Sequence, residues 1–241
     1  MMPLLLMIPG MTNTPGVWDL VRRHLTAEVE VRVTDLRASD GIAAMAAYAW
    51  QALDGVEASR PLAIAGYSMG GHVALQMLAT APRPVQALAL LCTSARPEDP
   101  ADAPMRERAI ASAQRDWGRY VHAIANHLVT PTGRANDELF RAILADLHDC
   151  GAEATISQHR AAASRPDNRM LLPTLRLHAL VMAGAADPRI ALASAREVAD
   201  AIPGAEWIEV ADGGHLLPWE HPELVSNAMD QWLRKIHSPR P

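Results

Sequence analysis

The sequence predicts an α/β protein in which a mostly parallel sheet of about six strands is flanked by helices. Two observations predict this class. Short apolar runs alternate along the chain with segments of helical periodicity, which is typical of parallel strands joined by crossover helices. Most of these runs are apolar at every position, as expected of strands that helices cover on both faces.

The domain organisation follows from length and from one interruption of this alternation. With 241 residues, of which 49% are hydrophobic, the chain can bury the core of one large domain. Residues 97–170 hold helix-like segments between the proline-rich stretches RPEDPADAP and SRPDNRMLLP. We therefore expect a core domain of residues 1–96 and 171–241, with residues 97–170 inserted as a helical cap over the strand ends, where open α/β sheets bind ligands.

Six segments are expected as strands, and they lie at residues 4–8, 29–33, 62–66, 87–91, 177–184 and 207–210. The first is the run LLLMI, and most of the six are continuously apolar. The second, VEVRV, alternates apolar and polar residues, so one of its faces is expected to be less covered. We predict that it forms an edge of the sheet.

The helices between the strands carry recognisable start signals. Thr14 is a candidate N-cap with Pro15 in the first turn, and the next helix follows Ser39 and Asp40. The last helix is expected to bury one stripe in the core, formed by Leu224, Val225, Ala228, Met229, Trp232, Leu233 and Ile236.

Charge and cysteine content restrict the partners. The net charge is −5 and the 22 basic residues form no basic run, so we expect no nucleic-acid partner. The apolar start MMPLLLMIPG has no lysine or arginine before it and is too short to span a bilayer, so we expect a cytoplasmic protein with no membrane segment. Cys92 and Cys150 are interpreted as structural thiols of a reducing compartment. The pattern leaves the oligomeric state open.

The stretch from Gly66 to Gly70, with the sequence GYSMG, matches the G-x-S-x-G nucleophile elbow at the point where a strand gives way to a helix. In such an elbow the serine sits on a tight, strained turn, and the flanking glycines leave room where strand and helix nearly touch. A glycine-rich phosphate loop is the alternative, but the lysine of a P-loop and the G-x-G-x-x-G order are both missing.

A serine nucleophile needs a histidine base and a carboxylate further along the chain, in the order Ser, Asp, His. Asp187 follows an apolar strand, and His215 lies in a glycine-rich loop between the last strand and the last helix. Taken alone, Asp187 is as easily a helix N-cap and His215 a solvated histidine. Together with Ser68 they predict a catalytic triad, with Asp212 as a second candidate for the acid.

From IPGMT to GGHLLPWEHPELV the chain resembles the α/β-hydrolase fold superfamily, and within it the capped, cofactor-free carboxylesterases and enol-lactonases. The elbow is also similar to those of lyases and carbon–carbon hydrolases. By this resemblance, the backbone N–H groups of Met11 and Met69 form the oxyanion hole. Pro9 and Gly10 stand where relatives commonly carry His-Gly. Where some members place the acid, after the fourth strand, this chain has Cys92, Thr93 and Ser94, which favours Asp187.

The resemblance implies a serine hydrolase that cleaves carboxylic esters or lactones of small molecules through an acyl-enzyme, without cofactor or metal. Two alternatives stay open. One is a lyase or carbon–carbon hydrolase that uses the same triad, and the other is a small-molecule binding protein built on the same scaffold.

Further side chains have both a functional and a packing interpretation. Trp18, Trp117 and Tyr120 are candidates to line an acyl pocket, with ordinary packing equally compatible. Arginines of the predicted cap, which are Arg106, Arg108, Arg115 and Arg119, either meet an anionic substrate or form a solvated helix face. The histidines and cysteine of this region, which are His122, His127, His148, Cys150 and His159, lack metal-ligand spacing and predict no metal site.

Overall fold

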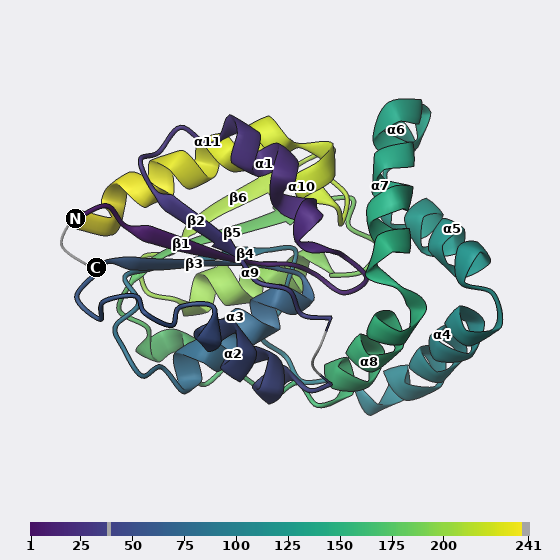
Figure 1. Cartoon of the computed structure of the whole chain (residues 1–241), viewed down its shortest axis with the longest axis horizontal. Coiled ribbons are helices and arrows are strands. Elements are labelled where there is room, and N and C mark those ends of the chain that lie inside the picture. Colours follow the sequence, from purple (N-terminus) through teal and green to yellow (C-terminus); the bar gives the residue numbers. More distant parts are fainter. Residues whose placement is uncertain (38–39, 238–241) are drawn as a thin grey trace.

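All six predicted strands form one parallel sheet in the computed structural model, which describes residues 1–37 and 40–237 (Figure 1). The strands are β1 (Leu4–Ile8), β2 (Glu30–Val33), β3 (Leu62–Tyr67), β4 (Ala87–Leu91), β5 (His178–Gly184) and β6 (Glu206–Val210). Their order across the sheet is β2-β1-β3-β4-β5-β6, with every neighbouring pair parallel. The α/β class is confirmed, and β2 is an edge strand as its alternating sequence predicts.

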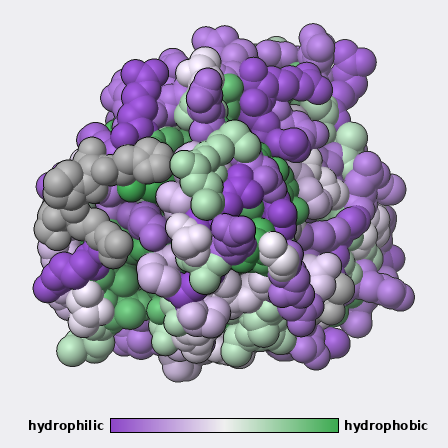
Figure 2. All heavy atoms as spheres, turned by 60° about the vertical axis from the view of Figure 1, so that its left-hand side comes forward, coloured by the Kyte–Doolittle hydropathy of each residue, from purple (hydrophilic) through white to green (hydrophobic). Residues whose placement is uncertain are grey.

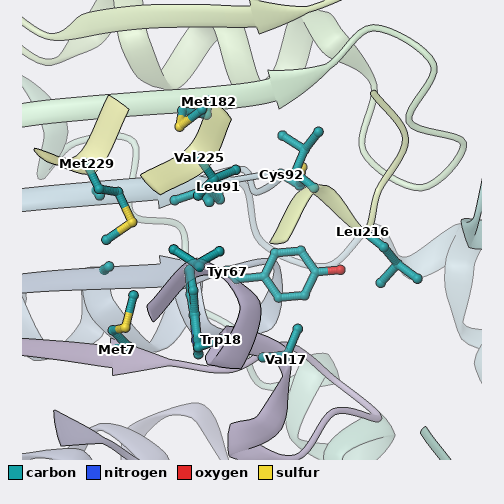
Figure 3. Close-up of a cluster of buried hydrophobic side chains, with 14 of the residues drawn as sticks. Met7, Val17, Trp18, Tyr67, Leu91, Cys92, Met182, Leu216, Val225 and Met229 are labelled. Carbon is teal, nitrogen blue, oxygen red and sulfur yellow. The ribbon is translucent and has the colours of Figure 1, made fainter. Parts of the chain in front are cut away.

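Helices cover both faces of the sheet. On one face lie α1 (Asp19–His24) and α11 (Pro222–Leu233), and on the other lie α2 (Ile42–Gln51), α3 (Met69–Ala79) and α9 (Leu192–Ala201) (Figure 1). Successive strand residues point to opposite faces. Met7 of β1 thus packs in the cluster with Trp18 and Met229 that Figure 3 shows, while its neighbour Leu6 joins the cluster with Val73 of α3.

The helix starts agree with the sequence in part. The Thr14 hydroxyl accepts a hydrogen bond from the Gly16 N–H at 2.9 Å and caps the 3₁₀ helix η1 (Pro15–Trp18) that leads into α1. The expected start signal of the second helix is wrong for Asp40, because the N-cap of α2 is Gly41. Ser39 lies outside the described residues.

One residue of the predicted core stripe, which runs from α11 into η4 (Arg234–His237), also differs. Six of the seven residues are buried, but Leu224 is 39% exposed. At 100° per residue Leu224 lies at the margin of the stripe, where its side chain faces solvent.

The segment between β4 and β5 is helical throughout its regular part. It contains η2 (Pro100–Asp102), α4 (Ala103–Arg115), α5 (Trp117–Leu128), α6 (Pro131–Ala135), α7 (Asp137–Cys150) and α8 (Ala152–Ala163). Figure 1 shows these helices beside the sheet, past the carboxyl ends of the strands. The two ends of the segment meet, because the Asn168 N–H donates to the Ala95 carbonyl at 2.9 Å.

Cys92 and Cys150 are both buried and unpaired. Within residues 1–37 and 40–237, every helix is too short or too polar to cross a bilayer. The molecular face shown in Figure 2 scatters its hydrophobic side chains among hydrophilic ones. Such scattered apolar side chains are ordinary on a protein surface and do not mark a site.

Candidate active site

Ser68 stands at the turn between the last residue of β3 and the first of α3, with φ 52° and ψ −115°. The glycines around it are steric requirements. A Cβ on Gly66 would lie 2.4 Å from the Gly70 carbonyl oxygen, and one on Gly70 would lie 2.4 Å from that of Ile8. The strand and helix therefore approach closely enough to hold Ser68 at the carboxyl edge of the sheet.

Backbone strain is concentrated at this edge. In the part of the chain that the structure describes, three non-glycine residues have positive φ, namely Thr12 at 61°, Ser68 at 52° and Cys92 at 48°. They follow β1, β3 and β4, which are neighbours in the sheet. Strained residues persist where the surrounding structure fixes them, and they cluster at functional sites.

The three residues expected as a triad form one chain of hydrogen bonds. His215 Nε2 lies 2.9 Å from Ser68 Oγ, and His215 Nδ1 lies 2.8 Å from Asp187 Oδ2. The His215 and Asp187 side chains are only 5% and 1% exposed. Because the carboxylate can only accept, Nδ1 carries the hydrogen and Nε2 is left to accept the Ser68 hydroxyl.

Both oxygens of Asp187 are used. Oδ1 accepts from the backbone N–H groups of Arg189 at 2.7 Å and Ile190 at 2.9 Å, as an N-cap would, and Oδ2 meets His215. No helix begins at Asp187, since the N-cap of α9 is Ala191, so the helix N-cap interpretation is wrong and these two bonds belong to a tight turn.

The loops that carry Asp187 and His215 are themselves joined. The Ala186 N–H donates to the Gly213 carbonyl at 3.0 Å, and a Cβ on Gly184 would lie 2.2 Å from that same oxygen. This close approach holds the end of β5 against the glycine-rich loop after β6, and thereby sets the distance between carboxylate and imidazole.

The second candidate acid does not reach the imidazole. The Asp212 side chain is 85% exposed, and its carboxylate lies 3.8 Å from His221 Nε2. Of the two aspartates, only Asp187 is positioned to orient His215.

Among the described residues, Cys92, Asp187 and His215 bring metal-ligating atoms within 4.8 Å of one another. A metal needs the thiolate form of cysteine. Burial, helped by the Asp187 carboxylate, raises the pKa of the Cys92 thiol well above its ordinary value, and the other two residues already hydrogen-bond each other. The donor set therefore fits an Asp–His pair better than a metal site.

The Met11 and Met69 backbones both border the cavity next to Ser68. Within the described residues, neither N–H takes part in the hydrogen bonds of turns and caps. Met69 is the first residue of α3, so its N–H has no partner inside the helix and lies at the positive end of the helix dipole. Both amides are thus available to a developing negative charge.

A cavity of about 220 Å³ opens over Ser68 and His215. Its apolar lining comes from α2, from α4 and α5 in the segment between β4 and β5, and from the loop after Asp187, with residues Ile42, Met105, Ala109, Ile124, Leu128 and Ile190. Such an apolar cavity with a few polar groups is typical of a small-molecule site.

Of the three aromatic residues considered for the pocket, the structure places only Tyr120 in the lining. Trp18 is fully buried and packs edge-on against Tyr67 in the core, with ring centroids 6.3 Å apart (Figure 3). Trp117 stacks on Tyr120 at 5.4 Å and donates from its indole to the His148 carbonyl. The pocket prediction is therefore wrong for both tryptophans, because each is taken up by packing.

The four arginines considered in the inserted segment fall into two groups, one lining the cavity and one exposed to solvent. Arg106 lines the cavity, whereas Arg108, Arg115 and Arg119 are exposed and form the solvated face.

Sequence reasoning missed six polar residues of the cavity, which are Thr12, His72, Glu98, Asp102, Arg165 and Arg189. His72 was detectable, since it lies one helical turn after Ser68. The others come from segments whose convergence no local pattern reveals.

Comparisons with known proteins identify the family of this chain. A model of the alpha/beta hydrolase family matches residues 5–228, so the chain belongs to that family. A pimeloyl-[acyl-carrier protein] methyl ester esterase of Neisseria meningitidis is 29% identical over 188 residues, which cover 73% of this chain and 67% of that protein.

Two solved structures extend the comparison. A thermophilic esterase from Thermogutta terrifontis, with malate bound, is 28% identical with a TM-score of 0.89, covering 99% of this chain and 91% of that one. The enol-lactonase from Burkholderia xenovorans is 20% identical with a TM-score of 0.83, over 97% of this chain and 92% of that one. At that identity the lactonase supports the shared fold alone.

Proposed function

We propose that this protein is a serine hydrolase that cleaves carboxylic esters or lactones of small molecules. The observation that carries the proposal is the hydrogen-bonded series Ser68, His215 and Asp187 beneath an apolar cavity. The relatives named as esterases support ester hydrolysis as the reaction. Residues 97–170 would act as the cap that encloses the substrate, and the buried unpaired cysteines support a cytoplasmic location.

In the first half of the reaction, Ser68 Oγ attacks the carbonyl carbon while its proton passes to His215 Nε2. Asp187 keeps the hydrogen on Nδ1 and stabilises the imidazolium that forms. The N–H groups of Met11 and Met69 hold the oxyanion. The carbon–oxygen bond then breaks, and the departing alcohol oxygen takes the proton from His215.

In the second half, water attacks the acyl group on Ser68 and gives its proton to His215. The acid product leaves as Ser68 Oγ takes that proton back, so that the enzyme returns to its starting state. His215 relays each proton in this scheme, from Ser68 to the leaving alcohol and then from water to Ser68.

The experiment that tests the proposal is turnover of p-nitrophenyl esters of graded chain length and of a lactone set, with labelling by a fluorophosphonate. Wild type should turn over at least one ester and be labelled at Ser68. Ser68→Ala should lose on the order of 10⁶-fold in kcat and keep its Tm. Ser112→Ala, on α4 outside the cavity lining, is the matched control and should behave as wild type.

The outcomes also separate the alternatives. Labelling of Ser68 without ester or lactone turnover would favour a lyase or carbon–carbon hydrolase. A ligand-induced thermal shift without labelling or turnover would favour a binding protein. Full activity in Ser68→Ala would contradict the assignment of the nucleophile.

A further inference from the structure

We propose that the substrate of this cavity carries a carboxylate in addition to its ester, and that Arg106, Arg165 and Arg189 recognise it. The inference rests on the proposed function, and it names the class of substrate for the same site. It comes from the charged side chains that share the cavity lining with Ser68.

Two of these arginines share one acid. Glu98 forms an ion pair with Arg106 through one oxygen and with Arg165 through the other, at 2.7 Å for Arg165. The side chains of Arg106, Glu98 and Arg165 are only 9%, 10% and 16% exposed. Each Glu98 oxygen faces one guanidinium, and each guanidinium carries five N–H donors.

The third arginine has no acid of its own. In the part of the chain that the structure describes, the exposed Arg189 side chain makes no ion pair, yet it borders the cavity beside Asp187. Asp102, the only other acidic residue among the described lining residues, acts on Arg165 through its charge without an ion pair. The described lining therefore contains three guanidinium groups and two carboxylates, which leaves an excess of one positive charge.

Three buried polar atoms of the lining also lack hydrogen-bond partners. Arg165 Nε, His72 Nδ1 and Glu98 Oε2 have no hydrogen bond to other described residues. A buried donor without a partner is destabilising. A carboxylate entering the cavity would supply an acceptor for Arg165 Nε, and charge-assisted hydrogen bonds of this kind are among the strongest in proteins.

The neighbouring histidines are neutral and so do not add to the charge. Burial, together with the charge of nearby arginines, lowers the pKa of His72 to about 3 and that of His159 to about 4. His159 Nε2 is held 2.8 Å from the Tyr120 hydroxyl, and its carbonyl accepts from Arg106 at 3.4 Å. These contacts fix the polar wall next to the apolar part of the lining.

A purely structural role explains part of this arrangement, since Glu98 with its two arginines ties the start of the inserted segment to its end. It does not explain Arg189, whose side chain makes no ion pair within the described residues. Arg189 is therefore the residue that distinguishes recognition of an anion from packing.

The test compares two p-nitrophenyl esters of equal acyl length, the monoester of adipic acid with its free carboxylate and the neutral hexanoate. We expect wild type to favour the adipate ester in kcat/KM by about tenfold or more at low salt, and less in 0.5 M NaCl. Arg189→Gln should lower this ratio severalfold. The control Arg108→Gln removes an exposed arginine of α4 outside the lining and should leave the ratio unchanged.

A ratio at or below one in wild type that Arg189→Gln does not alter would overturn the inference, while hexanoate turnover would still uphold the proposed function. If neither ester is hydrolysed, the proposed function fails and calorimetric titration of adipate into Ser68→Ala decides the inference. Binding that Arg189→Gln weakens would support it, and absence of binding would overturn it.

Discussion

The Asp187 carboxylate is the most constrained group of the site, because its two oxygens have different partners. One is held by two backbone N–H groups, and only the other faces His215. The two backbone N–H groups thus fix the orientation of the carboxylate independently of its bond to the imidazole. A change that preserves its shape and removes its charge should affect chemistry more than folding.

We expect Asp187→Asn to lower kcat for a p-nitrophenyl ester by about 10⁴-fold, because an amide can present a donor to Nδ1 and favour the wrong imidazole tautomer. Asp212→Asn is the matched control, since that side chain is exposed and faces His221. Steady-state kinetics of both variants make the comparison. Similar losses in the two variants would contradict the assignment of the acid.

Residues of the site were predictable to different degrees. Ser68 was found because the elbow is a local pattern, and Asp187 and His215 because each ends a strand in the required order. Glu98 and Arg165 were not predictable, since they meet only after the chain between them has folded back on itself. The orientation of an aromatic residue such as Trp18 depends on packing, which spacing alone does not fix.

The loop after β1 is anchored by two helices of the inserted segment. The Thr12 N–H donates to Gln158 Oε1 of α8 at 2.8 Å. Asp146 of α7 accepts from the Asn13 amide at 3.0 Å and from the Thr14 hydroxyl. Gln158 is fully buried, so this contact is shielded from water. The same loop carries the Met11 N–H that we assign to the oxyanion hole.

We expect Gln158→Leu to lower the free energy of unfolding by about 1–3 kcal/mol, because the Thr12 N–H loses its buried acceptor. Movement of the loop should lower kcat more than it raises KM. Denaturant unfolding and steady-state kinetics measure the two effects.

Gln114→Leu is the control for this change, as an exposed amide on α4. An unchanged kcat in Gln158→Leu together with reduced stability would show that the contact serves folding alone.

At the level of elements, strands were more predictable than helices. The strands β1 and β4 agree with the expected limits because each is a continuous apolar run with polar or turn-forming residues around it. The division of residues 103–163 into α4 to α8 was not predicted. Those helices bury faces against one another, and such partners cannot be read from one periodic segment.

For the molecule as a whole, the buried histidines link stability to pH. The pKa values of His72 and His159 are lowered by burial to about 3 and about 4, below the ordinary 6.5. As pH falls below 6.5, the unfolded chain binds protons that the folded protein does not. Their contribution to stability is therefore fully present above pH 6.5 and is lost as pH falls toward these lowered values.

We expect the free energy of unfolding to fall between pH 7 and pH 5 by roughly 2 kcal/mol for each such histidine. Denaturant unfolding at the two pH values measures the change, and His72→Gln should show a smaller fall than wild type. Burial raises the pKa of Asp146 and Glu220, which acts in the opposite sense in both proteins. An equal fall in wild type and His72→Gln would contradict the role of His72.

The overall topology was largely predictable, because parallel strands with crossover helices leave few arrangements of the chain. The lateral order of the strands is one part that the alternation alone does not give. It depends on which strands pair across the sheet, as β1 does with both β2 and β3.

The hydrogen bond between Asn168 and Ala95, together with the Glu98–Arg165 ion pair, closes the inserted helices into a side loop of the chain. Insertions or deletions between Ala95 and Asn168 therefore need not displace β4 or β5, which hydrogen-bond to each other directly. The helices that line the cavity can accordingly change in length while Ser68, Asp187 and His215 keep their places in the core.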